Sequence, residues 1–185
     1  MKMETLAILQ RAAAMAASAH EGAKLRDDAT PYIAHPMRVS LIVSHVFECS
    51  DAEVIAGALL HDTLEKTSLT KKAIEAEFGP KVLHLVLALT KDESADPVKY
   101  WNDLKANLWE ARLIKMADTL DHLDCPPEDL SRRMKGGRQA LDLAHSDEEP
   151  IQLARKALEE ALAAAAIRSD ADSTIKVFLR QGAMK

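Results

Sequence analysis

The segment from Asp51 to Asp62 reads DAEVIAGALLHD, and its pattern decides the fold. Asp51 can cap a helix through its side-chain oxygen, and an apolar run then continues to His61. A helix that is apolar on nearly all sides belongs in a protein core. Glu65 lies four residues after His61 and three after Asp62, so it shares their helical face. The segment therefore predicts a buried helix that carries polar side chains to one point.

Helices are expected along the rest of the chain as well. Aromatic residues make up only 4% of the sequence while Ala and Leu are abundant, which favours helices over sheets. No segment alternates apolar and polar residues for long enough to predict a strand. The predicted fold class is therefore all-α. The expected helices cover residues 3–23, 36–48, 51–61, 70–79, 80–90, 96–123, 132–145, 151–168 and 169–180, with a loop over 24–31.

Glycine and proline set several of these boundaries. Pro80 is predicted to open a new helix after Phe78-Gly79. Cys125-Pro126-Pro127 is predicted to end the helix over 96–123, because proline cannot continue a helix. Gly136-Gly137 is predicted to interrupt the helix over 132–145.

The length of the chain fits one domain over residues 1–185, and no linker divides it. The net charge of −5 argues against a general nucleic-acid surface, although a pocket for a small anion needs only a few local cations. The first residues of the sequence do not predict a signal peptide, and no apolar run has membrane-spanning length. Cys49 and Cys125 have no CxxC spacing. We therefore expect a cytoplasmic protein without a nucleic-acid or membrane partner, and its assembly into a homo-oligomer stays open.

Four residues of metal-ligand type occur in helical settings that could aim them at one point: His35, His61, Asp62 and Asp118. His35 precedes Pro36, which suits the first turn of a helix. Asp118 ends the apolar helix face of residues 113–118, where a carboxylate is costly unless it is paired or bound to a metal. Histidine and carboxylate ligands suit a divalent transition metal, and four of them leave positions for water or a phosphate oxygen. The set therefore predicts a metal centre.

The order and context of these residues carry a resemblance to a known family. Residues 30–36, TPYIAHP, resemble the PYIxHP segment of HD-domain hydrolases of the RelA/SpoT type. Residues 58–67, ALLHDTLEKT, resemble their ALLHDxxEDT motif, and residues 113–118, LIKMAD, resemble their IKLAD segment. Phe78-Gly79, the apolar helix after it and Thr90-Lys91 are similar to a further family segment. The resemblance covers about residues 20–125 and implies a single compact helical HD-domain bundle, which the C-terminal helices complete.

The short chain is most similar to the stand-alone small alarmone hydrolases of this family. That resemblance implies a Mn²⁺-dependent removal of the 3′-pyrophosphate from (p)ppGpp, with a nucleotide as the small-molecule partner. It assigns the metal to His35, His61, Asp62 and Asp118. Water on a divalent cation can lose a proton near neutral pH, and Glu65 would orient or deprotonate that water.

Departures from the family pattern fall on positions expected to face the substrate. The family's Glu-Asp pair reads Glu65-Lys66 here, and Lys66 either makes Glu65 a poorer base or binds a phosphate. The family's R/K-L-H/Y-N-x-R pattern after Asp118 reads TLDHLD over residues 119–124, which is expected to change the charge around the substrate. The candidate catalytic residues are Glu65 and Lys66, and the candidate substrate contacts are Lys24, Arg26, Tyr32 as a base-stacking residue, Lys91, Lys115 and His122, with Arg132, Arg133 and Arg138 as further phosphate candidates.

Two other functions stay open at this point. One is a phosphatase that acts on a related nucleotide, such as NADPH or a nucleoside monophosphate. The other is a nucleotide-binding pseudo-hydrolase that keeps the metal and has lost turnover through Lys66. Inactive members of the family typically lose the His-Asp motif, and its presence as His61-Asp62 favours an enzyme. For Asp118 the simple alternative is a helix salt bridge with Lys115 or His122.

Overall fold

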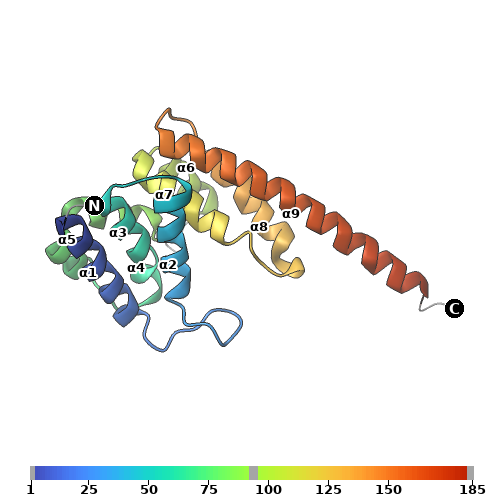
Figure 1. Ribbon diagram of the computed structural model, residues 1–185, viewed down its shortest axis with the longest axis horizontal. Helices are drawn as coiled ribbons and strands as arrows, with labels where there is room; N and C mark the ends of the chain where they lie inside the picture. Colours follow the sequence, from blue (N-terminus) through green and yellow to red (C-terminus); the bar gives the residue numbers. More distant parts are fainter. Residues whose placement is uncertain (1–2, 92–95, 183–185) are drawn as a thin grey trace.

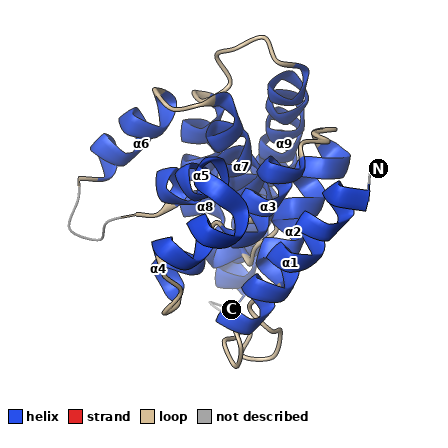
Figure 2. Cartoon of the chain, turned by 90° about the vertical axis from the view of Figure 1, so that its left-hand side faces the viewer, coloured by secondary structure: helices blue, strands red, loops and turns tan. Residues whose placement is uncertain are grey.

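The computed structural model describes residues 3–91 and 96–182 of the chain. Within those ranges the chain consists of helices and loops, without a strand and with one isolated bridge between Lys24 and Pro31 (Figure 2). Nor do these ranges include a helix with the length and apolarity that a membrane crossing needs. The all-α expectation is confirmed.

The helix α3 (Ala52–Leu60) lies at the centre of the fold. Asp51 caps it by accepting a hydrogen bond from the backbone N–H of Glu53 at 2.8 Å, as the sequence predicts. Every residue from Val54 to Leu60 is buried, because helices pack on α3 from several sides. These neighbours are α1 (Met3–Ala19), α2 (Ala34–Leu41), α5 (Lys71–Leu89) and α7 (Trp109–Asp121).

The remaining helices pack around this core or continue one of its helices. The π-helix η1 (Ile42–Val46) continues α2, and the one-turn helix α4 (Thr63–Lys66) follows α3. The helix α6 (Pro97–Lys105) packs on α5 and α7. The last two helices, α8 (Pro127–Leu141) and α9 (Glu149–Gly182), pack on α7 and on each other. One apolar cluster runs from α2 and α3 through α7 into both of them, and α9 extends well beyond the bundle (Figure 1).

The prediction of a single helix over residues 96–123 is wrong, because the helical conformation is interrupted between α6 and α7. The side-chain oxygen of Asn107 accepts a hydrogen bond from Leu108 N–H at 2.9 Å and bonds with His84 Nε2 at 2.8 Å. Leu108 itself is extended, with φ −54° and ψ 146°. A short polar side chain that bonds to the local backbone competes with the helix, and here it separates two helices.

The interruption expected at Gly136-Gly137 is also wrong, and α8 begins at Pro127 rather than near Arg132. A Cβ atom on Gly137 would lie 2.7 Å from Leu162 Cδ2 of α9. The glycine therefore allows the two helices to approach closely, which is a packing role rather than a helix-breaking one.

Other boundaries differ in detail from the expected ones. The boundary expected near residue 168 is absent, since α9 is continuous from Glu149 to Gly182. The break expected at Gly79-Pro80 is confirmed as a kink between two helical parts of α5, where Gly79 is non-helical with a φ of 81°. The first helix ends at Ala19 rather than at residue 23, and part of the helix expected over 36–48 is the π-helix η1.

Candidate active site

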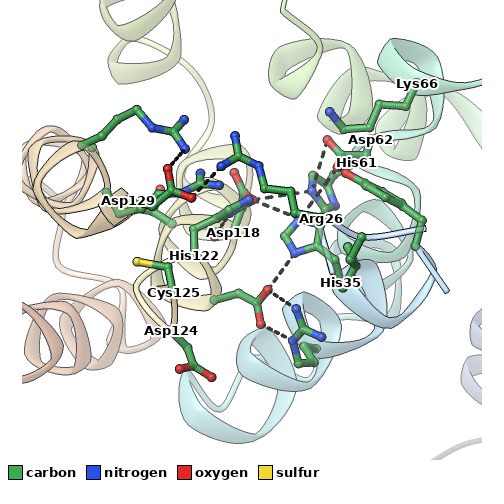
Figure 3. Close-up of a pocket in the computed structure, with 18 of the residues that line it drawn as sticks. Arg26, His35, His61, Asp62, Lys66, Asp118, His122, Asp124, Cys125 and Asp129 are labelled. Atoms are coloured by element: carbon green, nitrogen blue, oxygen red, sulfur yellow. Dashed lines mark hydrogen bonds and ion pairs between the residues drawn. The ribbon is translucent and has the colours of Figure 1, made fainter. Parts of the chain in front are cut away.

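Four polar side chains meet where three helices come together (Figure 3). His35 is the second residue of α2, His61 caps the C-terminal end of α3, and Asp62 lies in the turn before α4. Asp118 lies in the last turn of α7. Because α2, α3 and α7 are in mutual contact, residues far apart in the sequence reach the same place.

The imidazole and carboxylate atoms of this group are close enough to share one ion. One ligand atom each of His35, His61 and Asp118 lies within 4.8 Å of the other two. Asp118 Oδ1 is 3.2 Å from His35 Nε2 and 3.8 Å from His61 Nε2. Asp62 lies beside them, with Oδ2 3.7 Å from His35 Nε2 and Oδ1 3.5 Å from His61 Nε2. The structure thus brings together the four residues predicted as ligands.

Each of the two histidines has a buried ring nitrogen without a hydrogen-bond partner in the part of the chain that the structure describes. His61 Nδ1 lies 2.8 Å from the carbonyl oxygen of Ala58, and His35 Nδ1 lies 2.7 Å from Asp121 Oδ2. Both partners are acceptors, so both Nδ1 atoms are assigned the proton. Neither Nε2 atom, both of them buried, has an assigned hydrogen bond to a described residue, although Asp118 Oδ1 lies 3.2 Å from that of His35. An unpaired buried nitrogen is costly, and two of them beside carboxylates fit a metal ion.

The charges at the site favour a cation. Burial alone would lower the pKa of His35, but the carboxylates of Asp118 and Asp121 raise it to about 9. Burial alone would raise the pKa of Asp118, but Lys115 and the neighbouring histidines hold it well below its usual range. Asp118 is therefore an ionised carboxylate in a buried setting. The space between these groups attracts positive charge, whether it is a proton or a metal ion.

Asp118 also makes the salt bridges that its helical spacing allows. Lys115 Nζ donates to Asp118 Oδ2 at 2.6 Å, and both residues are buried. His122 Nδ1 lies 2.8 Å from the carbonyl oxygen of Asp118 and 2.9 Å from its Oδ1. The Lys115 ammonium also lies 5.8 Å from the ring centres of Tyr100 and Trp101. Lys115 is therefore an internal partner of Asp118 as well as a predicted phosphate contact.

Tyr32 supports Asp62 at the edge of the site. Its hydroxyl donates a hydrogen bond to Asp62 Oδ2. The centre of its ring is 4.7 Å from that of His20 and 5.8 Å from Lys66 Nζ. The sequence predicts Tyr32 as a surface for base stacking and misses this hydrogen bond, which orients a predicted metal ligand.

Glu65 has a neighbour on each carboxylate oxygen. Oε2 accepts a hydrogen bond from the backbone N–H of Lys91 at 3.1 Å, and Oε1 lies 3.3 Å from Lys66 Nζ. The Lys91 ammonium lies 5.5 Å from the centre of the Tyr100 ring, and its pKa is lowered by the nearby Lys115 and by burial. Glu65 is thus held in place by groups other than the four predicted ligands.

These side chains line an open cavity of about 900 Å³. A cavity of this size accommodates a ligand as large as a nucleotide. All the catalytic, substrate-contacting and metal-binding residues predicted from the sequence line it, and so do Arg132 and Arg133. Arg138 is not among the described residues that line it. The cations around the cavity come from the loop before α2, from α2 itself, from α4, from the segment after α5, from α7 and from α8.

Two acidic residues make contacts that the sequence does not predict. Asp129 Oδ2 is 2.5 Å from Arg26 Nη1 and its Oδ1 is 2.8 Å from Arg132 Nη2, so ion pairs join the loop before α2 to α8. Arg26 and Asp129 are 103 positions apart, and no sequence pattern links them.

Asp121 binds His35, and its position three residues after Asp118 was the available signal. Asp124, which lines the cavity, is exposed and points away from His35 (Figure 3).

Known proteins resemble this chain in sequence and in structure. Residues 12–122 match the HD domain family. The chain is 36% identical over 137 residues to the guanosine-3′,5′-bis(diphosphate) 3′-pyrophosphohydrolase MESH1 of Danio rerio, a match that covers 69% of this chain and 76% of that protein. The protein of the same name from Homo sapiens is 33% identical over 163 residues, covering 83% of this chain and 90% of the relative.

A solved structure supports the same relationship. It is that of a metazoan orthologue of SpoT that hydrolyses ppGpp and plays a role in starvation responses. It superposes on this chain with a TM-score of 0.68 at 26% sequence identity. The superposition covers 85% of this chain and 94% of that one.

Proposed function

The chain belongs to the HD-domain family, and from this premise we propose that it is a metal-dependent (p)ppGpp 3′-pyrophosphohydrolase. The reaction adds water across the bond between the 3′ oxygen and phosphorus, and it yields pyrophosphate and a nucleotide with a free 3′ hydroxyl. The observation that carries the proposal is the pair of unpaired Nε2 atoms of His35 and His61, beside two carboxylates in a nucleotide-sized cavity. The activity named for the relatives supports the choice of substrate.

The proposed ligands of one divalent cation are His35, His61, Asp62 and Asp118, and the proposed cation is Mn²⁺. Mixed imidazole and carboxylate ligands suit an ion of this class. When bound, the cation would lower the pKa of a water molecule and neutralise phosphate charge. Lys115 balances the charge of Asp118 from the other side, since it donates to Oδ2 while Oδ1 faces the imidazoles.

Glu65 is proposed to orient the attacking water and to take its proton. The Lys91 N–H fixes Oε2, so the carboxylate keeps one orientation at the cavity wall. Among the described residues, Oε1 has the 3.3 Å contact with Lys66, which is longer than a strong charge-assisted hydrogen bond. Oε1 is therefore the oxygen that a water molecule can reach.

Lys66 is proposed to contact a phosphate group of the substrate. Its side chain is 38% exposed and lines the cavity, and among residues 3–91 and 96–182 its acidic partner is Oε1 of Glu65, at 3.3 Å. Lys24 and Lys91 also line the cavity, so a phosphate group can meet more than one cation there. The other proposed substrate contacts are Lys24, Arg26, Tyr32, Lys91, Lys115, His122, Arg132 and Arg133.

The test is hydrolysis of ppGpp by protein that has been stripped of metal with a chelator and reloaded with Mn²⁺. We expect pyrophosphate and GDP to form in equal amounts, and only in the reloaded protein. The control is His61→Ala, which should lose both metal and turnover. NADPH and nucleoside monophosphates belong in the same assay, because release of phosphate from these alone would identify a phosphatase. Binding of metal and ppGpp without turnover would identify a pseudo-hydrolase, and either result overturns the proposal.

A further inference from the structure

The carboxylate of Asp121 bonds to two partners from α2. Its Oδ2 lies 2.7 Å from His35 Nδ1. Arg38 donates from Nε to Oδ1 at 2.6 Å and from Nη2 to Oδ2 at 2.9 Å. The Asp121 side chain is 7% exposed, whereas that of Arg38 is 49% exposed. Asp121 therefore links a buried imidazole to a cation at the surface.

This arrangement determines which nitrogen of His35 is free. A carboxylate accepts hydrogen bonds, so the Nδ1 atom beside it holds a proton, and the neutral imidazole that a metal binds has its lone pair on Nε2. Nε2 is the buried, unpaired atom that faces Asp118 Oδ1 at 3.2 Å. The orientation of the ring is fixed as well, because turning it over would break the bond to Asp121.

We infer that Asp121 is a positioning residue for metal binding, which orients His35 and sets its tautomer while Arg38 holds Asp121 in place. The inference rests on the metal site of the proposed function and deepens it. A metal-bound histidine is usually oriented and made more basic by a partner on its other ring nitrogen. Loss of such a partner typically weakens metal binding by about 10-fold to 100-fold.

The other histidine of the site has a different support. His61 Nδ1 bonds with the carbonyl oxygen of Ala58 at 2.8 Å, within its own helix. His35, in contrast, is supported by a side chain from another helix, since it lies on α2 and Asp121 lies on α7. A single substitution at Asp121 can therefore remove the support of His35 and leave that of His61 intact.

The structure gives the negative charge of Asp121 a different role from the one that the sequence suggests. From the sequence, Asp121 adds negative charge around the substrate. In the structure both of its oxygens are occupied by Arg38 and His35. Substitution of Asp121 should therefore change metal affinity more than it changes KM for the nucleotide.

The experiment measures the Mn²⁺ affinity of the full chain without substrate, by competition with a metal-sensitive dye. Asp121→Ala should raise the Kd for Mn²⁺ by about 10-fold to 100-fold. Asp121→Asn keeps an oxygen acceptor for His35 and should recover part of this loss. Asp124→Asn is the matched control, because it removes the same charge from an exposed side chain that points away from His35 (Figure 3). Its Kd should equal that of the wild type.

Thermal unfolding separates a positioning role from a folding defect. The metal-stripped variants should unfold at the wild-type Tm, and Mn²⁺ should raise the Tm of Asp121→Ala less than that of the wild type. If metal-stripped Asp121→Ala melts well below the wild type, the Kd of the folded Asp121→Asn variant for Mn²⁺ is compared with that of the wild type instead. Wild-type affinity in the folded variant, or an equal loss in Asp124→Asn, overturns the inference. A wild-type protein that binds Mn²⁺ without cleaving ppGpp overturns only the proposed function.

Discussion

The carboxylate of Glu65 is the group whose loss best separates chemistry from metal binding, because its contacts are Lys91 N–H and Lys66. Glu65→Gln should keep the metal content of the wild type and lower kcat on ppGpp by about 100-fold, a typical contribution of a general base. Steady-state kinetics and elemental analysis of the same preparation measure both quantities. Turnover at the wild-type rate would remove Glu65 from the mechanism.

Two residues at the cavity differ from the family pattern and are close to catalytic groups. Lys66 contacts Glu65, and His122 contacts Asp118. Restoring the family residues with Lys66→Asp and His122→Asn should change the ratio of kcat/KM between ppGpp and other phosphorylated nucleotides. Parallel kinetics on these substrates measure the ratio. A change smaller than about threefold, which is under 1 kcal/mol, would mean that neither position sets specificity.

For single residues, the sequence predicts which side chains meet at the site better than it predicts their hydrogen bonds. His35, His61, Asp62 and Asp118 could be named because each stands in a recognisable local context. The bonds of Tyr32 to Asp62 and of Asp121 to His35 could not, because the first depends on how the loop before α2 meets the end of α3 and the second on how α2 packs on α7. Local sequence carries no record of that packing.

The N-terminus of α3 couples the stability of the core to pH. Burial alone would raise the pKa of Asp51, but hydrogen bonds from Lys81 and the Glu53 N–H lower it overall. A carboxyl with a lowered folded-state pKa stabilises the protein above its unfolded pKa, and this contribution is lost as the pH falls through the folded value. Asp51→Asn keeps the cap and removes the ionisable group.

The wild type should therefore be more stable than Asp51→Asn at neutral pH, and the difference should shrink between about pH 5 and about pH 2. Urea unfolding of both proteins across this range measures the change. A difference in free energy of unfolding that stays constant with pH would show that Asp51 acts only as a cap.

The two adjacent glycines of α8 offer a matched pair of substitutions. A Cβ atom on Gly136 meets nothing within 4 Å, whereas one on Gly137 meets Leu162 at 2.7 Å. Gly136→Ala should raise the free energy of unfolding by about 0.5–1 kcal/mol, because alanine loses less backbone entropy in a helix. Gly137→Ala forces the half-buried Leu162 side chain to shift, so it should stabilise the protein less than Gly136→Ala does. Chemical denaturation measures both, and equal stabilisation would contradict the close packing of α8 and α9.

At the scale of elements, boundaries that depend on local bonds were predictable and those that depend on packing were not. Asp51 caps α3 and Gly79-Pro80 kinks α5, as their residue types indicate. The break at Asn107 depends on His84 of α5, and the continuity of α8 through Gly137 depends on α9. Intrinsic helix propensities describe an isolated helix, whereas the conformation at Asn107 and at Gly137 also depends on contacts with a neighbouring helix.

Over the whole molecule, the sequence could predict the all-α fold and which residues meet at one cavity, because one family pattern spans most of the bundle. The shape of the cavity could not, because its wall combines the loop before α2 with α4, α7 and α8. The ion pairs of Asp129 with Arg26 and Arg132 close part of that wall. Contacts between such distant segments follow only from the assembled structure.

The proposed ligands lie on α2, at the end of α3 and on α7, and this placement affects how stable the protein is in the cell. An ion bound to all of them ties together segments that are distant in the chain, and both cysteines are free, so a disulfide has no part in this. Because the unfolded chain cannot assemble the site, a cation stabilises the folded form by about 2.7 kcal/mol at one hundred times its Kd. The Tm should therefore rise with Mn²⁺ concentration, fall on chelation and be unaffected by either in His61→Ala, as differential scanning calorimetry can measure. Under metal starvation such a chain would become a better substrate for proteases, so scarcity of the ion would lower the amount of enzyme as well as its turnover.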